Sequence, residues 1–113
     1  MANIEKIENI LEQKFTKERV AKWRKQFAPR KLNIIVVDDK IAVLRPVTAD
    51  AVARYSMLVA DKSEGLASAA RYLINELWLD GDNEIQDDEE YFIAAMLQVQ
   101  NSIELKKSTF YSL

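Results

Sequence analysis

The sequence contains no histidine and no cysteine, and its only glycines are Gly65 and Gly81. Without cysteine, a disulfide framework and a thiolate zinc site are excluded. Without histidine, serine and threonine nucleophiles lack their usual general base, and two isolated glycines do not make a phosphate-binding loop. We therefore expect no enzymatic activity, no cofactor and no metal site.

The remaining composition is that of an ordinary globular protein. The 113 residues suit one domain, and 49% apolar with 30% charged residues is a folded balance. We expect a single domain over 1–113, with a helical arm at 1–28 and a hairpin plus helices at 32–113. The longest apolar run, Tyr91 to Leu97, is too short to span a bilayer, and the first residues lack a signal-peptide core. No membrane partner is expected.

Charge is distributed unevenly although the net charge is only −2. The stretch 14–31 holds eight basic residues and one acid, whereas 80–90 holds seven acids and no base. The basic stretch, with aromatic residues interleaved, is compatible with nucleic-acid binding. Trp23 and Phe27 share an apolar helix face with Val20, however, so we interpret the bases first as a solvated helix surface and second as a dock for an acidic partner. That acidic partner could be the 80–90 segment of the same or a neighbouring subunit.

Apolar spacing predicts two helices in the arm. Ile4, Ile7 and Leu11 recur at helical intervals, and Asn3 is a plausible N-cap. Thr16 can cap a second helix, with a break near Phe15 where the apolar phase slips. Pro29 should end this helix, because the residue before a proline disfavours the helical conformation.

One β-hairpin is predicted, from 32–37 paired with 40–45. The first run is rich in β-branched residues, Asp38 and Asp39 are turn formers, and Pro46 closes the second strand. No other strong strand signal is found. The outer edge of a lone hairpin could pair with another chain, so a homo-oligomer is plausible.

Three helices should follow, at about 49–60, 64–79 and 88–109. Thr48 and Ser63 are the expected N-caps of the first two, and Asp87 or Asp88 that of the third. Gly81 suits a left-handed stop after the second helix, and 82–87 is expected to be a polar loop. The expected apolar faces are Val52, Tyr55, Leu58 and Val59, then Leu66, Ala70, Leu73, Ile74 and Leu77, then Phe92, Met96, Val99 and Ile103. Lys106 and Lys107 would suit the last helix dipole.

The acidic segment does not match a calcium loop. Counting from Asp80, Ile85 stands where an EF-hand needs glycine and Tyr91 where it needs glutamate. Helix capping and solvation explain these acids, and turn or cap roles explain the adjacent pairs 38–39 and 87–88.

The aromatic residues near the last two helices allow two interpretations. They can pack in the core, or they can anchor a partner protein, because Trp and Tyr dominate interface hot spots. Together with the charge blocks they give seven candidate partner-binding residues: Lys17, Lys22, Trp23, Arg24, Trp78, Asp82 and Tyr91.

The C-terminal part resembles small phage and prophage proteins of the tail-assembly-chaperone type. The matching features are the strand end Leu44-Arg45-Pro46, the helix end and turn 76–85 (ELWLDGDNEI) and the acidic cap 87–89 before Phe92. The resemblance covers about 34–107, roughly two-thirds of the chain. It implies a virion morphogenesis protein with no catalytic residues, located in the cytoplasm of a bacterial host or in the virion.

The sequence thus predicts a mostly helical α+β protein that acts through protein–protein contacts. The resemblance implies a tape-measure or tail-tube protein as partner, held soluble until assembly, or a minor structural role in the virion. The alternative is a small nucleic-acid-associated regulator that uses the basic segment 14–31. We favour the first hypothesis over this alternative and over an enzyme.

Overall fold

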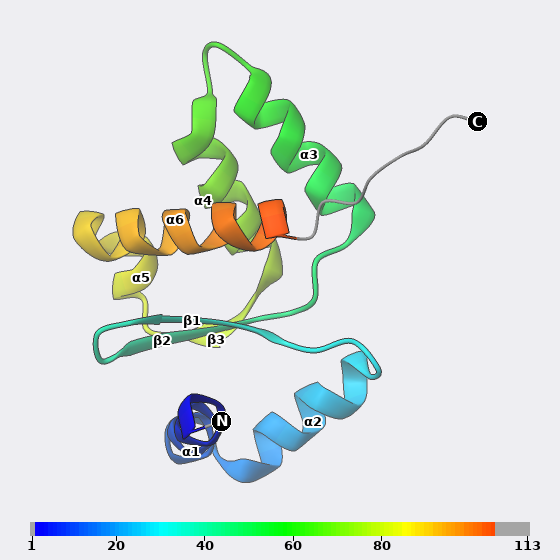
Figure 1. Cartoon of the computed structure of the whole chain (residues 1–113), viewed down its shortest axis with the longest axis vertical. Coiled ribbons are helices and arrows are strands. Elements are labelled where there is room, and N and C mark those ends of the chain that lie inside the picture. The colour runs from blue at the N-terminus through cyan, green and yellow to red at the C-terminus, as the bar shows by residue number, and fades with distance from the viewer. Residues whose placement is uncertain (1, 106–113) are drawn as a thin grey trace. The chain divides into compact units, whose positions relative to one another are not determined.

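The computed structural model describes the backbone of residues 2–105 and the side chains of residues 5–100. Over these residues it shows six helices and a three-stranded antiparallel sheet, so the predicted mostly helical α+β class is confirmed. The chain divides into two compact units, Met1–Leu32 and Asn33–Leu113 (Figure 1). Each is described by itself below.

The first unit is a pair of helices, α1 (Ala2–Phe15) and α2 (Lys17–Phe27). The predicted break is confirmed at Thr16, which has a φ of 71° and whose side chain accepts a hydrogen bond from Arg19 N–H at 3.3 Å. The end of α2 before Pro29 is also as predicted. Asn3 as an N-cap is wrong, because α1 already includes Ala2.

The hairpin of the second unit is confirmed almost to the residue. Strand β1 (Asn33–Val37) pairs antiparallel with β2 (Lys40–Leu44), and Val37 stands opposite Lys40 across the Asp38–Asp39 turn. Asp38 has a φ of 54°, a conformation that Asp tolerates in tight turns.

A third strand, β3 (Trp78–Gly81), lies on the other side of β2. The predicted helix 64–79 therefore ends earlier, because α4 covers Gly65–Leu77. Gly81 as a left-handed stop is also wrong. Its role is close approach: a Cβ on Gly81 would come within 2.6 Å of Ala42 Cα on β2.

Helix α3 (Ala49–Ala60) begins as predicted, with Thr48 Oγ1 accepting from Ala51 N–H at 3.1 Å. Its predicted apolar face is only partly right, because Tyr55 is buried but Val59 is 42% exposed. Ser63 does not cap α4. Its N–H and hydroxyl both donate to Asp61 Oδ1, and the helix begins at Gly65, where φ is 82°.

The predicted polar loop 82–87 is wrong in part. It contains a short helix, α5 (Glu84–Asp87), which carries the fully buried Ile85 into the core. Helix α6 (Glu89–Leu105) then follows, and Asp88 caps it as expected by accepting from the N–H groups of Glu90 and Tyr91 at 3.0 and 3.2 Å. The predicted continuation to residue 109, with Lys106 and Lys107, lies outside the described residues.

The core of the second unit lies between the sheet and the helices. Figure 1 shows α4 and α6 over one face of the sheet, with α3 packed along α4. β1 and β2 contribute Ile35, Ala42 and Leu44 to this core. The helices contribute Ala51, Tyr55, Ala69, Ala70, Leu73, Ile74, Leu77, Ile85, Phe92, Ala95 and Val99. Among the described helices, none has the length and apolar character needed to cross a membrane.

Candidate protein-interaction site

Strand β1 is an edge of the sheet, because the strand order is β1-β2-β3. In a two-residue hairpin the pair that flanks the turn is hydrogen-bonded, and bonded pairs then alternate along the strands. Val37, Ile35 and Asn33 consequently bond to β2. The N–H and C=O groups of Ile34 and Val36 point away from β2, toward the open edge.

One side chain from α6 reaches this open edge. Gln98 Nε2 donates to the carbonyl of Val36 at 2.9 Å, which agrees with an outward-facing Val36 carbonyl. Gln98 is itself exposed, so the bond is reachable by solvent. No other side chain in residues 5–100 bonds the outward groups of Ile34 and Val36.

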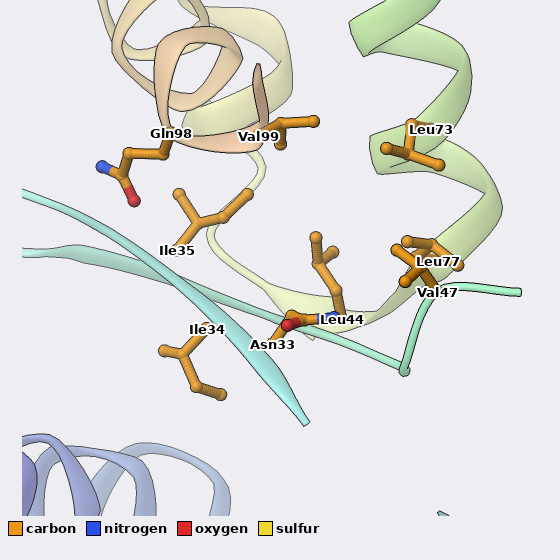
Figure 2. A pocket seen from close by; sticks show the side chains of 9 residues that line it. All are labelled: Asn33, Ile34, Ile35, Leu44, Val47, Leu73, Leu77, Gln98 and Val99. Atoms are coloured by element: carbon orange, nitrogen blue, oxygen red, sulfur yellow. The ribbon is translucent and has the colours of Figure 1, made fainter. Parts of the chain in front are cut away.

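A cavity of about 120 Å³ opens beside the same edge. It lies between β1, β2, α4 and α6, and Figure 2 shows the Ile35 and Leu44 side chains between the strands and the two helices, whereas Ile34 lies on the other side of β1. Only Asn33 and Gln98 are polar among its lining residues. The others are Ile34, Ile35, Leu44, Val47, Leu73, Leu77 and Val99.

Helix α6 also exposes apolar side chains. Ile93 and Leu97 are 46% and 50% exposed, although they are large aliphatic residues. They lie four residues apart and therefore form one stripe on the helix. At about 100° per residue, the stripe and Gln98 lie on opposite sides of the buried Phe92, Ala95 and Val99 face of α6, so the stripe is a surface separate from the β1 edge.

The hairpin turn and α5 form an acidic end of the second unit. Lys40 Nζ bonds Glu84 Oε2 at 2.8 Å, and this contact is the main reason that the pKa of Glu84 is lowered and that of Lys40 is raised. Tyr91 lies near this end. Desolvation first, and then the charges of Asp39 and Asp38, raise its pKa. Within the described residues, no group of three or more carboxylates is arranged to hold a metal ion.

Asp82 has a structural role at this end. Its N–H donates to the carbonyl of Ile41 at 2.9 Å, and its carboxylate accepts from Ile41 N–H at 2.8 Å. It extends the pairing of β2 beyond β3. Asp82, a candidate partner-binding residue, therefore already forms hydrogen bonds with β2 of its own unit.

Four of the seven candidates lie on α2 in the first unit. Lys17 and Lys22 are exposed, and Arg24 forms an ion pair with Glu8 at 3.3 Å. Trp23 is half-buried, meets the ring of Phe15 edge to face at 5.7 Å and carries the Arg19 guanidinium at 4.9 Å from its ring. Part of the basic, aromatic surface is thus occupied by its own contacts.

The other three candidates are in the second unit but not at one place. Trp78 begins β3 opposite Leu44 and packs on the core, whereas Asp82 and Tyr91 lie near the hairpin turn at the other end of β2. The partner-binding role of all seven residues stays a prediction. The β1 edge and its cavity were not among the candidates, and no local sequence signal marks Gln98.

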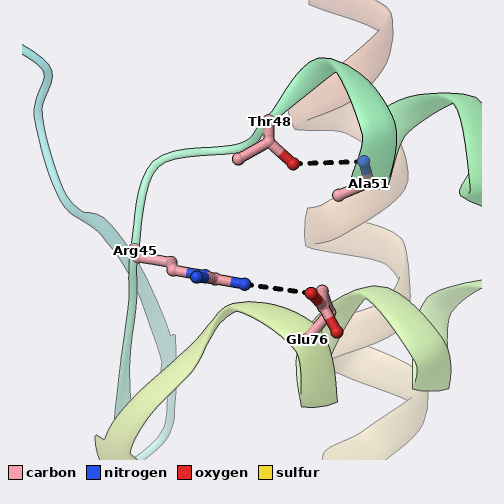
Figure 3. Close-up of polar contacts among 4 residues, drawn as sticks. All are labelled: Arg45, Thr48, Ala51 and Glu76. Atoms are coloured by element: carbon pink, nitrogen blue, oxygen red, sulfur yellow. Dashed lines mark hydrogen bonds and ion pairs between the residues drawn. The ribbon is translucent and has the colours of Figure 1, made fainter.

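The Arg45–Pro46 step joins the sheet to the helices. Arg45 Nη2 pairs with Glu76 Oε1 at 3.0 Å (Figure 3), and Arg45 N–H donates to the carbonyl of Leu77 at 2.8 Å. Pro46 is buried, and Thr48 opens α3 directly afterwards. The step therefore fixes where β2 ends, α3 begins and α4 ends.

No protein-family model, curated protein or solved structure matches the chain.

Proposed function

We propose that this protein is an adaptor or assembly chaperone that holds an extended segment of a partner protein against strand β1. The observation that carries the proposal is the open β1 edge beside an apolar cavity, which Gln98 alone among the side chains of residues 5–100 reaches across. Edge strands of this kind bind peptides by strand addition. Main-chain hydrogen bonds supply affinity and adjacent pockets supply specificity.

The register indicates how such a segment would bind. Its main chain would bond the outward groups of Ile34 and Val36, after Gln98 releases the Val36 carbonyl. A partner residue opposite Ile35 or Asn33 has its side chain on the helix-covered face of the sheet, where the cavity lies. A Leu, Ile, Val or Phe side chain suits that cavity.

The expected affinity is modest. Burying one such side chain contributes about 1.5–3 kcal/mol, and each main-chain hydrogen bond adds about 1 kcal/mol net. Much of this gain is offset by the cost of ordering a flexible segment. Reversible binding fits a chaperone that must hand its partner over.

The resemblance to tail-assembly chaperones supplies the context for this proposal. The partner would be a tape-measure or tail-tube protein, bound in the host cytoplasm before assembly. If the protein is instead a minor component of the virion, it would bind in the same way but remain in the particle. The exposed Ile93–Leu97 stripe offers a second apolar contact surface in either version.

Co-expression with a phage tail-tube or tape-measure protein tests the proposal. We expect a co-purifying complex that Val36→Pro disrupts, because proline removes the outward N–H without removing a bond to β2. Val36→Thr, which keeps the N–H and the β-branched shape, is the matched control. A protein that purifies alone and is absent from virions would contradict the phage assignment.

A second pair of variants tests the cavity. Val47→Phe places a larger side chain at the cavity, and Val59→Phe makes the same change at an exposed position on α3. We expect Val47→Phe to weaken partner binding by about tenfold, equivalent to about 1.4 kcal/mol, and Val59→Phe to leave it unchanged. Equal binding by both variants would rule out the cavity as the specificity pocket.

The nucleic-acid alternative is favoured by one observation, the exposed Lys17, Lys22 and Lys25 on α2. Binding of this type depends steeply on salt, because phosphate contacts release counterions. A DNA or RNA fragment titrated at low and moderate salt distinguishes the two functions. No binding at low salt would eliminate this alternative.

A further inference from the structure

Helix α6 presents a row of side chains beside the open β1 edge. Tyr91, Ala94 and Gln98 follow one another at spacings of three and four residues, so they share one side of the helix. Gln98 places this side at the edge, because it donates to the Val36 carbonyl. Tyr91 and Ala94 are half-buried. A strand added to β1 would therefore have its helix-facing side chains along this row.

The two ends of the β1 edge differ in chemistry. At the Asn33 end, mostly apolar residues line the cavity of about 120 Å³. At the Val37 end the chain continues into Asp38 and Asp39, which are both exposed and form no ion pair with the described residues. The ammonium group of the neighbouring Lys40 is bonded to Glu84. The edge is thus apolar at one end and acidic at the other.

Tyr91 belongs to the acidic end. Figure 1 shows α6 starting on the side of the sheet where the hairpin turns, and the charges of Asp39 and Asp38 act on the Tyr91 hydroxyl. The pKa of Tyr91 is raised, first by desolvation and then by these two charges. An aromatic ring beside two carboxylates suits a Lys or Arg side chain, because its apolar stem packs on the ring while its charge faces the acids.

We infer that the segment bound at β1 carries a basic residue followed, at alternate positions, by two aliphatic residues, and that it runs antiparallel to β1. The inference rests on the proposed function and names the class of segment that this function selects. An antiparallel segment directs three alternate side chains to the helix-covered face, opposite Val37, Ile35 and Asn33 in that order. The basic residue opposite Val37 lies beside the acidic turn, and the aliphatic residues lie at the cavity.

The size of the cavity restricts the aliphatic positions. An apolar cavity of about 150 Å³ holds one benzene ring. The smaller space beside β1, about 120 Å³, therefore suits one Leu, Ile or Val side chain better than a Phe side chain. Antiparallel pairing is also slightly more stable per residue than parallel pairing, which favours the direction inferred here.

Calorimetric titration with short capped peptides tests the charge requirement. We expect acetyl-SKTLTLS-amide to bind about tenfold more tightly than acetyl-SETLTLS-amide, with a difference that shrinks at high salt, because the contacts are exposed ion pairs. Asp38→Asn/Asp39→Asn should weaken binding of the lysine peptide about fivefold. Asn tolerates the positive φ of Asp38 as Asp does, so the hairpin turn is kept.

The matched control for this variant is Asp50→Asn/Glu64→Gln. It removes the same amount of charge in the first turn of α3 and just before α4, at exposed positions outside the hairpin. We expect it to leave binding of the lysine peptide unchanged. Equal weakening by both double variants would mean that only net charge matters, which would overturn the role of the turn acids.

A peptide of reversed order, acetyl-SLTLTKS-amide, tests the direction. In antiparallel pairing its lysine comes to the Asn33 end, away from Asp38 and Asp39, so it should bind about fivefold more weakly than the first peptide. Equal or tighter binding of the reversed peptide would overturn the antiparallel direction.

The inference and the proposed function fail in distinguishable ways. Equal binding of the lysine and glutamate peptides, with both weakened by Val36→Pro and Val47→Phe, would overturn the basic residue and leave the adaptor function standing. Absence of binding by all three peptides, or binding insensitive to Val36→Pro and Val47→Phe, would overturn strand addition at β1 and the inference with it.

Discussion

The two edges of the sheet are built differently. At the β3 edge, the Asp80 carboxylate accepts from the N–H of the next residue, Gly81, at 2.8 Å, and the pairing with β2 is interrupted at Val43–Leu44. β3 is short and is followed directly by α5. At the β1 edge, the strand is uncharged and uninterrupted, and among the side chains that the structure describes it is reached only by the exposed Gln98. The difference indicates that β3 completes the fold, whereas β1 is left available for contact.

The largest expected effect comes from detaching β3. Gly81→Val should destabilise the protein by about 3 kcal/mol, because the added side chain would collide with the β2 backbone at Ala42. Gly65→Ala is the control, since Gly65 has a positive φ but open space around it, and should cost about 1 kcal/mol. Urea unfolding of both variants measures the difference. Equal costs would mean that β3 is not held by close approach.

The second prediction tests which backbone groups of β1 face outward. Val36→Pro and Val37→Pro are the same substitution at adjacent, half-buried valines. Val37→Pro removes a bond to β2 and should cost about 3 kcal/mol, whereas Val36→Pro should cost about 1 kcal/mol. Thermal unfolding compares them. A reversed order would place the open edge groups at the other residues and remove the basis of the proposed site.

Much of this fold follows from local sequence rules. The β-branched run before Asp38–Asp39 predicts the hairpin, and Thr16, Thr48 and Asp88 predict three helix starts that the structure confirms. These features depend on neighbours within a few residues. They are therefore visible without knowledge of the tertiary structure.

The elements that sequence analysis missed depend on distant partners. The four-residue strand β3 continues a helical apolar pattern and becomes a strand because β2 offers it an unpaired edge. Ile85 is a single apolar residue in an acidic stretch, and only the core reveals its role.

The candidate site was missed for the same reason. The cavity gathers residues from positions 33–35, 44–47, 73–77 and 98–99, and Gln98 meets Val36 across 62 positions. The charged and aromatic candidates were selected by composition instead. Several of them, including Arg24 and Asp82, have contacts within their own unit.

The third prediction removes one side chain that bonds a backbone group at each edge, Asp80 at the β3 edge and Gln98 at the β1 edge. Asp80→Ala leaves Gly81 N–H without its acceptor and should cost about 1–2 kcal/mol of stability, since hydrogen bonds to charged groups are the stronger kind. Gln98→Ala should cost about 0.5–1 kcal/mol or less, because its bond is neutral and exposed. The two variants should also differ in self-association. Gln98→Ala frees the Val36 carbonyl and should strengthen it, while Asp80→Ala should not.

Gln98→Glu provides the matched control for that experiment, since a carboxylate of similar size cannot donate to the Val36 carbonyl. In size-exclusion chromatography across a concentration series, we expect Gln98→Glu to self-associate to the same extent as Gln98→Ala. If both Gln98 variants associate less than the original protein, the side chain supports the contact instead of covering the edge.

The smallest expected effect concerns pH and the Lys40–Glu84 contact, which ties the start of β2 to the helix that follows β3. The pKa of Glu84 is lowered from 4.5, chiefly by the hydrogen bond from Lys40, so its contribution is present above that value and is lost as pH falls through the folded pKa. The pKa of Lys40 is raised from 10.5, chiefly by the same bond, so its contribution is present below that value and is lost as pH rises through the folded pKa.

Lys40→Met should therefore be less stable than the original protein near neutral pH, and the difference should shrink in both acid and strong base. Lys62→Met, at an exposed position in the turn after α3, should show no such profile. A difference that stays constant from acid to base would mean that the contact contributes through packing and not through charge.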